Sequence, residues 1–177
     1  MCAECDGTTW GERPGGDTRD TGWDWFDEEA RRPRGARYLE EIAETGWAVC
    51  TVRGDGYDLP YGYTVGLTRY HGHPEVMVSG VDECGAMEYL DRVGAYVRSG
   101  ERYGVGDGVG LGRERGVFLA VDQPDLLELA QKVYGRPGGP AVPALQLVVS
   151  DDAGRLPWER GWSAWSQVLY GTPRGVG

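Results

Sequence analysis

The chain has 177 residues, of which 40% are hydrophobic and 26% charged, a composition typical of one folded domain with its own core. Its net charge of −10 repels phosphate backbones and therefore argues against nucleic-acid binding. No stretch approaches the ~20 consecutive apolar residues that span a bilayer, and no signal-peptide pattern is present, so we expect a cytoplasmic protein without membrane contact.

The first half of the chain predicts an arm, a helix and three strands. Residues 1–35 combine Gly, Pro, charge and tryptophan without a helical or strand period, which indicates a loosely ordered N-terminal arm. An apolar stripe predicts a helix over 36–44. Strand-favouring residues follow at 47–53 and 61–68, as a hairpin with a long loop, and a third strand is expected at 75–79.

A longer helix and a fourth strand come next. Asp82 is a good N-cap for a helix that ends before Gly100, because Met, Leu and Val recur on one face between them. The glycine-rich stretch 103–112 predicts a loop or an irregular strand, and the apolar run 117–121 predicts a fourth strand.

The last third of the chain predicts one more helix and one more strand. Asp125 and Glu128 have the spacing of a capping box, which would open a helix that ends at Gly135. The apolar run 144–150 predicts the last strand.

The predicted order is α-β-β-β-α-β-α-β. Hairpin-linked strands with helices inserted later favour an α+β fold, with a mainly antiparallel sheet of about five strands and two to three helices. We expect one domain over 36–170, preceded by the arm over 1–35 and followed by a flexible tail over 171–177.

Two short patterns are compatible with metal binding. Cys2 and Cys5 have the spacing of a ligand pair, which is half of a tetrahedral zinc site, or they are two unused thiols at a chain end. His71, His73 and Glu75 alternate along the chain, so they share a face if the chain is extended. Such a group would hold zinc or another divalent metal, or carry protons; the alternative is a polar turn.

Two further segments carry candidate groups. Tyr61 and Tyr63 share one face of a predicted strand and Thr64 faces the other, an arrangement that suits either a ligand pocket or ordinary packing. Asp151 and Asp152 end the last strand, where carboxylates serve as metal ligands, as an acid/base pair or as the start of a turn.

Four blocks taken together resemble a known family. They read GWAVCTVRGD, PYGYTVGLT, GHPEVMVSGV and ALQLVVSDDAGRLPWERGW. The combination, which extends from about Tyr38 to Trp162, is similar to the bacterial family catalogued as domain of unknown function 4262. That resemblance implies no particular reaction, and it implies that the following residues cluster: Tyr63, Thr64, His73, Glu75, Gln146, Asp151, Trp158 and Glu159.

The favoured hypothesis is a ligand- or peptide-binding accessory domain of a bacterial cytoplasmic pathway. Its pocket would lie on the sheet face around the YTVGL, HPE and PWE segments, because aromatic sites with few charges suit such ligands. A protein partner or a second copy would bind through the N-terminal arm. The candidate binding residues are Tyr61, Tyr63, Thr64, Gln146, Trp158 and Glu159.

The alternative hypothesis is an enzyme. His71, His73, Glu75 and Asp151 would supply metal ligands or proton carriers for a metal-assisted or acid/base hydrolase or transferase. This hypothesis requires the third and last strands to bring these side chains together. A flavin-binding protein is a third possibility, which rests on the order of elements alone.

Overall fold

The computed structural model describes residues 28–54 and 59–173. Most of the predicted N-terminal arm, the Cys2–Cys5 pair and the end of the predicted tail lie outside these residues. Among the residues described, no helix has both the length and the apolar character needed to cross a membrane.

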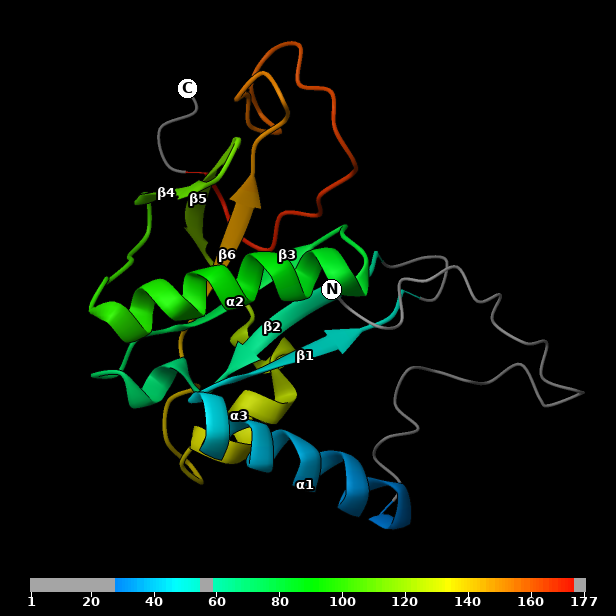
Figure 1. The fold of residues 1–177 in the computed structure, drawn as a ribbon, viewed down its shortest axis with the longest axis vertical. Helices are drawn as coiled ribbons and strands as arrows, with labels where there is room; N and C mark the ends of the chain where they lie inside the picture. The colour runs from blue at the N-terminus through cyan, green and yellow to red at the C-terminus, as the bar shows by residue number, and fades with distance from the viewer. Residues whose placement is uncertain (1–27, 55–58, 174–177) are drawn as a thin grey trace, which may run out of the picture.

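A six-stranded sheet forms the centre of the domain, with the strand order β1-β2-β3-β6-β5-β4 (Figure 1). Every neighbouring pair is antiparallel except β3 and β6, which run parallel. The predicted α+β class with a mainly antiparallel sheet is therefore confirmed, with six strands in place of about five. The strands are β1 (Ala48–Val52), β2 (Tyr61–Val65), β3 (Glu75–Ser79), β4 (Gly108–Leu111), β5 (Glu114–Ala120) and β6 (Ala144–Val149).

Three helices cover the two faces of this sheet: α1 (Glu28–Thr45), α2 (Glu83–Ser99) and α3 (Glu128–Tyr134). Strand alternation separates two cores, because Val76 and Val78 pack with buried residues of α2, whereas Met77 packs with residues of α1 and α3. Single 3-10 turns, η2 (Leu67–Arg69) and η3 (Pro124–Leu126), follow β2 and precede α3.

The caps of α2 agree with the sequence. The Asp82 side chain accepts a hydrogen bond from the Gly85 N–H at 2.8 Å, and Gly100 ends the helix in the left-handed conformation. These signals are local, so they need no knowledge of the tertiary structure.

Three predicted boundaries are wrong. Helix α1 begins at Glu28 and not at 36. It runs through Pro33 and Gly35, although both residues disfavour a helix on propensity alone. The second strand ends at Val65, where the chain turns into η2. The capping box does not form, because Leu127 is the N-cap residue of α3 and makes no side-chain cap.

The segment 150–173 contains no helix or strand and lies beyond and across the end of β6 (Figure 1). Side-chain amides attach it to the sheet. Gln167 accepts from the Val149 N–H at 3.0 Å and donates to the Val149 carbonyl at 2.8 Å. Gln146 donates to the Val168 carbonyl and accepts from the Tyr170 N–H at 2.7 Å.

Candidate functional site

The buried carboxylate of Glu75 accepts hydrogen bonds from the turn that follows β2 and stabilises it. Oε1 accepts hydrogen bonds from the Gly66 N–H at 3.0 Å, the Thr68 N–H at 3.1 Å and the Thr68 hydroxyl at 2.9 Å. Oε2 accepts from the Thr64 hydroxyl at 2.7 Å and the Leu67 N–H at 3.2 Å. These bonds use the accepting capacity of both oxygens, so the carboxylate is occupied within the protein.

The turn around Glu75 leaves room only for glycine at position 66. Gly66 has a φ of 135°, and a Cβ there would lie 2.7 Å from the Gly46 carbonyl oxygen. Burial raises the pKa of Glu75, while the hydrogen bonds from Thr64, Gly66 and Thr68 act in the opposite direction. The carboxylate therefore carries a desolvation cost that its neutral donors partly offset.

His73 is also buried, and both of its ring nitrogens are occupied. Nδ1 lies 2.6 Å from the Pro74 carbonyl oxygen, and Nε2 lies 3.2 Å from the Tyr103 nitrogen. Because a backbone N–H can only donate, Nε2 accepts and the proton of the neutral ring sits on Nδ1. Burial lowers the pKa of His73, and the nearby charge of Arg102 adds to the effect.

The predicted histidine pair does not converge. His71 is exposed and occupies the left-handed region, with a φ of 56°, in the turn before His73. Over residues 28–54 and 59–173, no group of three or more His, Cys, Asp or Glu side chains is placed to hold a metal ion. Cys2 and Cys5 lie outside these ranges, so the prediction of a cysteine metal site stays a prediction.

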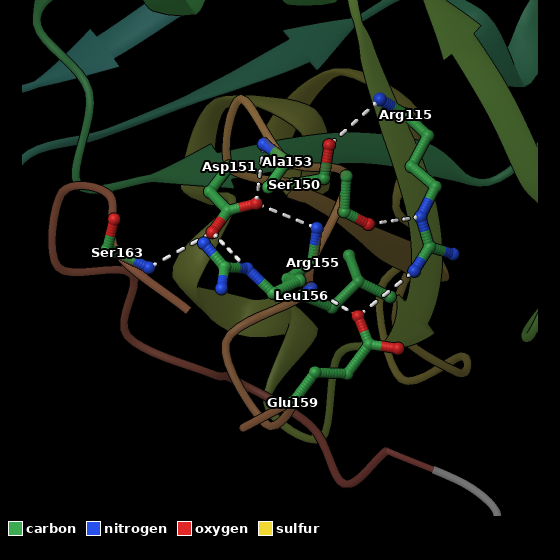
Figure 2. A network of polar contacts seen from close by, with 9 residues as sticks. Arg115, Ser150, Asp151, Ala153, Arg155, Leu156, Glu159 and Ser163 are labelled. Atoms are coloured by element: carbon green, nitrogen blue, oxygen red, sulfur yellow. Dashed lines mark hydrogen bonds and ion pairs between the residues drawn. The ribbon is translucent and has the colours of Figure 1, made fainter. Parts of the chain in front are cut away.

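A second polar network surrounds Asp151, directly after β6 (Figure 2). Oδ1 accepts from the Ala153 N–H at 3.0 Å and the Arg155 N–H at 2.8 Å. Oδ2 accepts from the Arg155 Nε–H at 2.9 Å and the Ser163 N–H at 3.1 Å. Burial raises the pKa of Asp151, but the hydrogen bonds from Arg155 and Ser163 and the Arg155 charge outweigh it, so the net shift is downward.

Glu159 connects the same segment to β5. Its Oε2 accepts from the Leu156 N–H at 2.6 Å and from Arg115 Nη2 at 3.0 Å. Arg115, which points toward Glu159 in Figure 2, also donates from Nε to the Gly154 carbonyl at 2.7 Å. Because the ion pair is exposed, it contributes little to the free energy of folding, and its main effect is to fix the path of the loop over β5.

The aromatic and amide candidates lie mainly in the interior. The Tyr63 side chain is fully buried, and its hydroxyl accepts from the Leu129 N–H at 3.2 Å. Tyr61 is half-buried beside the Tyr63 ring, with centroids 6.2 Å apart. Gln146 is fully buried, and Trp158 packs at the edge of a small cluster around Val148.

The candidates form two groups at opposite ends of the sheet. Glu75 lies opposite Ala144 at the start of the parallel β3–β6 pair, whereas Asp151 follows the end of β6. At about 3.3 Å per residue, their backbones are separated by roughly 20 Å along the strand direction. The depression beside Tyr61, lined also by Pro60, holds only about 40 Å³.

Two tryptophans in the C-terminal segment differ from the candidates above, because their polar atoms are not occupied by the described protein groups. The indole nitrogens of Trp162 and Trp165 are buried and have no hydrogen-bond partner among the residues that the structure describes. From the sequence, Trp162 is expected with Trp158 near the aromatic face of Tyr61 and Tyr63, and Trp165 has no expected role. The dense run of tryptophans over 158–165 is the only signal that pointed to them.

The matched part of the chain includes both networks. The family model described as Domain of unknown function (DUF4262) matches residues 41–163, which contain Glu75, His73, Asp151 and Trp162. No protein with a curated description and no solved structure matches the chain. The matched range covers well over half of the sequence, so this chain belongs to the DUF4262 family.

Proposed function

We propose that this domain binds a small molecule or a short peptide in a bacterial cytoplasmic pathway and does not itself carry out a reaction. The support is the state of its polar groups. The hydrogen-bonding atoms of the acid/base candidates Glu75, His73 and Asp151 are occupied by backbone and side-chain groups of the protein itself, and these bonds hold turns in place. Such groups stabilise a scaffold, and a scaffold of this kind positions a binding surface.

The observation that carries the proposal is that the indole N–H groups of Trp162 and Trp165 have no partner within the described part of the chain. An indole nitrogen can only donate, and a buried donor without an acceptor costs about 1–3 kcal/mol. A ligand that offers a carbonyl or carboxylate oxygen to these donors recovers that free energy. Tryptophan also supplies a large apolar surface with one polar atom, which is the composition of many ligand sites.

The segment that bears these tryptophans is attached on both sides. Ser163, next to Trp162, donates its N–H to Asp151, and Gln167, two residues beyond Trp165, pairs with the backbone of Val149. Trp165 lies between these two attachments, and Trp162 lies immediately before the first. Since both indole nitrogens are enclosed, the chain around the attachment points must shift to admit an acceptor.

Indole N–H resonances in the NMR spectrum provide the test, because a new hydrogen bond shifts them downfield. We would screen small carboxylates, amides and short peptides by thermal shift, and assign the two resonances with the Trp162→Phe and Trp165→Phe variants. A binder is expected to move these two resonances and to lose affinity for both variants. A binder that leaves both resonances in place and binds the variants with unchanged affinity would contradict the proposal. Failure of every acceptor-bearing compound in the panel to bind would also count against it.

The hydrolase alternative has no comparable support. It requires His73, Glu75 and Asp151 within hydrogen-bond reach of one substrate, and the fold places Asp151 at the far end of β6 from the other two. The hydrolase and flavin-binding alternatives stay predictions from the sequence.

A further inference from the structure

The outer edge of β4 is made of glycine backbone. Strand β4 lies at one edge of the sheet, with β5 on its inner side (Figure 1). Gly108 and Gly110 are exposed, whereas Val109 and Leu111 between them are buried. A Cβ added to Gly110 would meet nothing within 4 Å among the described residues, so the face of the strand on which Gly110 would carry its side chain is open.

The pairing with β5 shows which backbone groups are left over. The Phe118 N–H donates to the Asp107 carbonyl, and the β4–β5 register continues with Val109 opposite Gly116 and Leu111 opposite Glu114. Bonding alternates along an antiparallel ladder, so the odd-numbered residues of β4 spend their N–H and C=O groups on β5. Those of Gly108 and Gly110 therefore point away from the sheet.

Beyond its short length of four residues, the edge has few of the features by which proteins usually prevent edge pairing. It carries no lysine, no proline and no inward-pointing charge, and its glycines add no side-chain bulk. From the described residues, a side-chain hydrogen bond reaches it from the Tyr96 hydroxyl to the Gly110 carbonyl. At 3.4 Å this contact is long for an O–H···O bond, so the carbonyl retains accepting capacity.

We propose that β4 pairs with β4 of a second copy of this chain, antiparallel and about a two-fold axis through Gly110. The occupant is inferred from self-complementarity. In the register that places Gly110 opposite Gly110, Val109 lies opposite Leu111. Asp107, just before β4, then comes near Arg113 in the turn that follows the strand, twice by symmetry. Asp107 and Arg113 are both exposed, and Arg113 makes no ion pair within the described parts of the chain.

This register also provides hydrogen-bond partners for the outward-pointing backbone groups of β4. It pairs even-numbered with even-numbered residues, which are the ones whose N–H and C=O groups point outward. The two apolar side chains fall on one face and glycines alone on the other, so no bulky side chains collide across the new pair. Because β4 has only four residues, the dimer should be weak and reversible.

Sedimentation velocity over a concentration series tests the dimer. Wild type is expected to show a concentration-dependent monomer–dimer equilibrium. Gly110→Pro removes an outward N–H that β5 does not use, and by symmetry removes two hydrogen bonds from the dimer, so association should weaken about tenfold or more. Gly110→Ala is the matched control, because it keeps the N–H and its Cβ has space. Arg113→Glu should also weaken the dimer, since it brings a second carboxylate near Asp107 of the other copy.

A cross-linking pair tests the register. Directly opposed residues in a hydrogen-bonded pair have Cα atoms about 5.5 Å apart, within the range that a disulfide can bridge. Mild oxidation should therefore link Gly110→Cys to its own copy much faster than Gly108→Cys, which would face Gly112. A strictly monomeric wild type, or a dimer that Gly110→Pro leaves intact, would overturn the proposal. The second outcome would favour another interface, such as the N-terminal arm. The Trp162 and Trp165 site is not involved, so these results are independent of ligand binding.

Discussion

Replacing Glu75 by glutamine tests whether its carboxylate stabilises the fold. The substitution keeps the size of the side chain but exchanges one acceptor oxygen for an NH₂ donor. If the remaining oxygen keeps the partners of Oε1, Gly66 and Thr68, the new NH₂ group faces the Leu67 N–H and the Thr64 hydroxyl. The Leu67 N–H, 3.2 Å from Oε2 in the wild type, then has a donor in front of it and no acceptor.

The expected magnitude follows from these contacts. A buried N–H without an acceptor costs about 1–3 kcal/mol, and the remaining bonds lose their charge assistance. Removing the charge also removes its desolvation cost, which is the reason that burial raises the pKa of Glu75, and this gain offsets part of the loss. We therefore expect the free energy of unfolding to fall by about 2 kcal/mol.

Urea unfolding followed by tryptophan fluorescence and by circular dichroism measures this change. The midpoint for Glu75→Gln should move to lower urea with an unchanged slope. Glu88→Gln is the matched control: Glu88 is exposed and pairs only with Arg92 on the same helix, so its loss should cost less than about 0.5 kcal/mol. The reasoning is refuted if both variants unfold at the wild-type midpoint.

Three further predictions concern other contacts of the scaffold. Burial lowers the pKa of His73, so the folded state favours the neutral ring, and its contribution to stability should be full above about pH 6.5 and decline as the pH falls below it. In equilibrium unfolding, His73→Gln should remove this pH dependence, whereas His71→Gln, at an exposed site, should retain it. Asp151→Asn should speed amide hydrogen exchange in the loop after β6, because the amide nitrogen replaces one of two oxygens that each accept two bonds; unchanged exchange would show that the loop is held otherwise. Gly94→Ala should lower the melting temperature, since its Cβ would collide with the Trp47 ring and overpacking typically costs about 1–3 kcal/mol. A wild-type melting temperature would mean that the ring moves freely.

Elements with local signals were predictable from the sequence. Helix α2 has a capping aspartate, an apolar stripe and a terminal glycine, and strand β3 is a short apolar run between turn residues. Both were found with nearly correct ends, because each signal acts within a few residues of the position that it determines.

Elements that depend on distant partners were not predictable in the same way. Strand β4 carries two glycines in four residues, and it is a strand because β5 supplies its hydrogen bonds and Val109 and Leu111 reach the core. The start of α1 was missed because helix propensity counts Pro33 and Gly35 as breakers. The capping box failed because the first turn after Pro124 is a 3-10 turn, so α3 starts later with Leu127 as its N-cap.

The sequence identified important polar residues but not their roles. Glu75, His73, Gln146 and Asp151 were selected as candidates for binding or catalysis, and all are buried. A carboxylate that receives backbone N–H groups and one that receives a substrate proton are the same residue type, so composition and spacing do not separate them. Only the partners in three dimensions do, and here the partners are backbone and side-chain donors of neighbouring turns.

The way in which the C-terminal segment is attached bears on whether it can open for a ligand. The parallel pairing of β3 with β6 covers only three residues on each strand, 75–77 and 144–146. Beyond that point, the side-chain amide of Gln167 binds the backbone of Val149 as a neighbouring strand would. Backbone bonds attach the two ends of the segment, at Ser150 and Tyr170, and side-chain bonds hold the part between them. Such a part opens more easily than one held by a continuous ladder, because each bond contributes only about 1 kcal/mol. Trp162 and Trp165 lie in such a segment, with their indole N–H groups unpaired within the described structure, so opening costs them no hydrogen bond and a suitable acceptor can provide one.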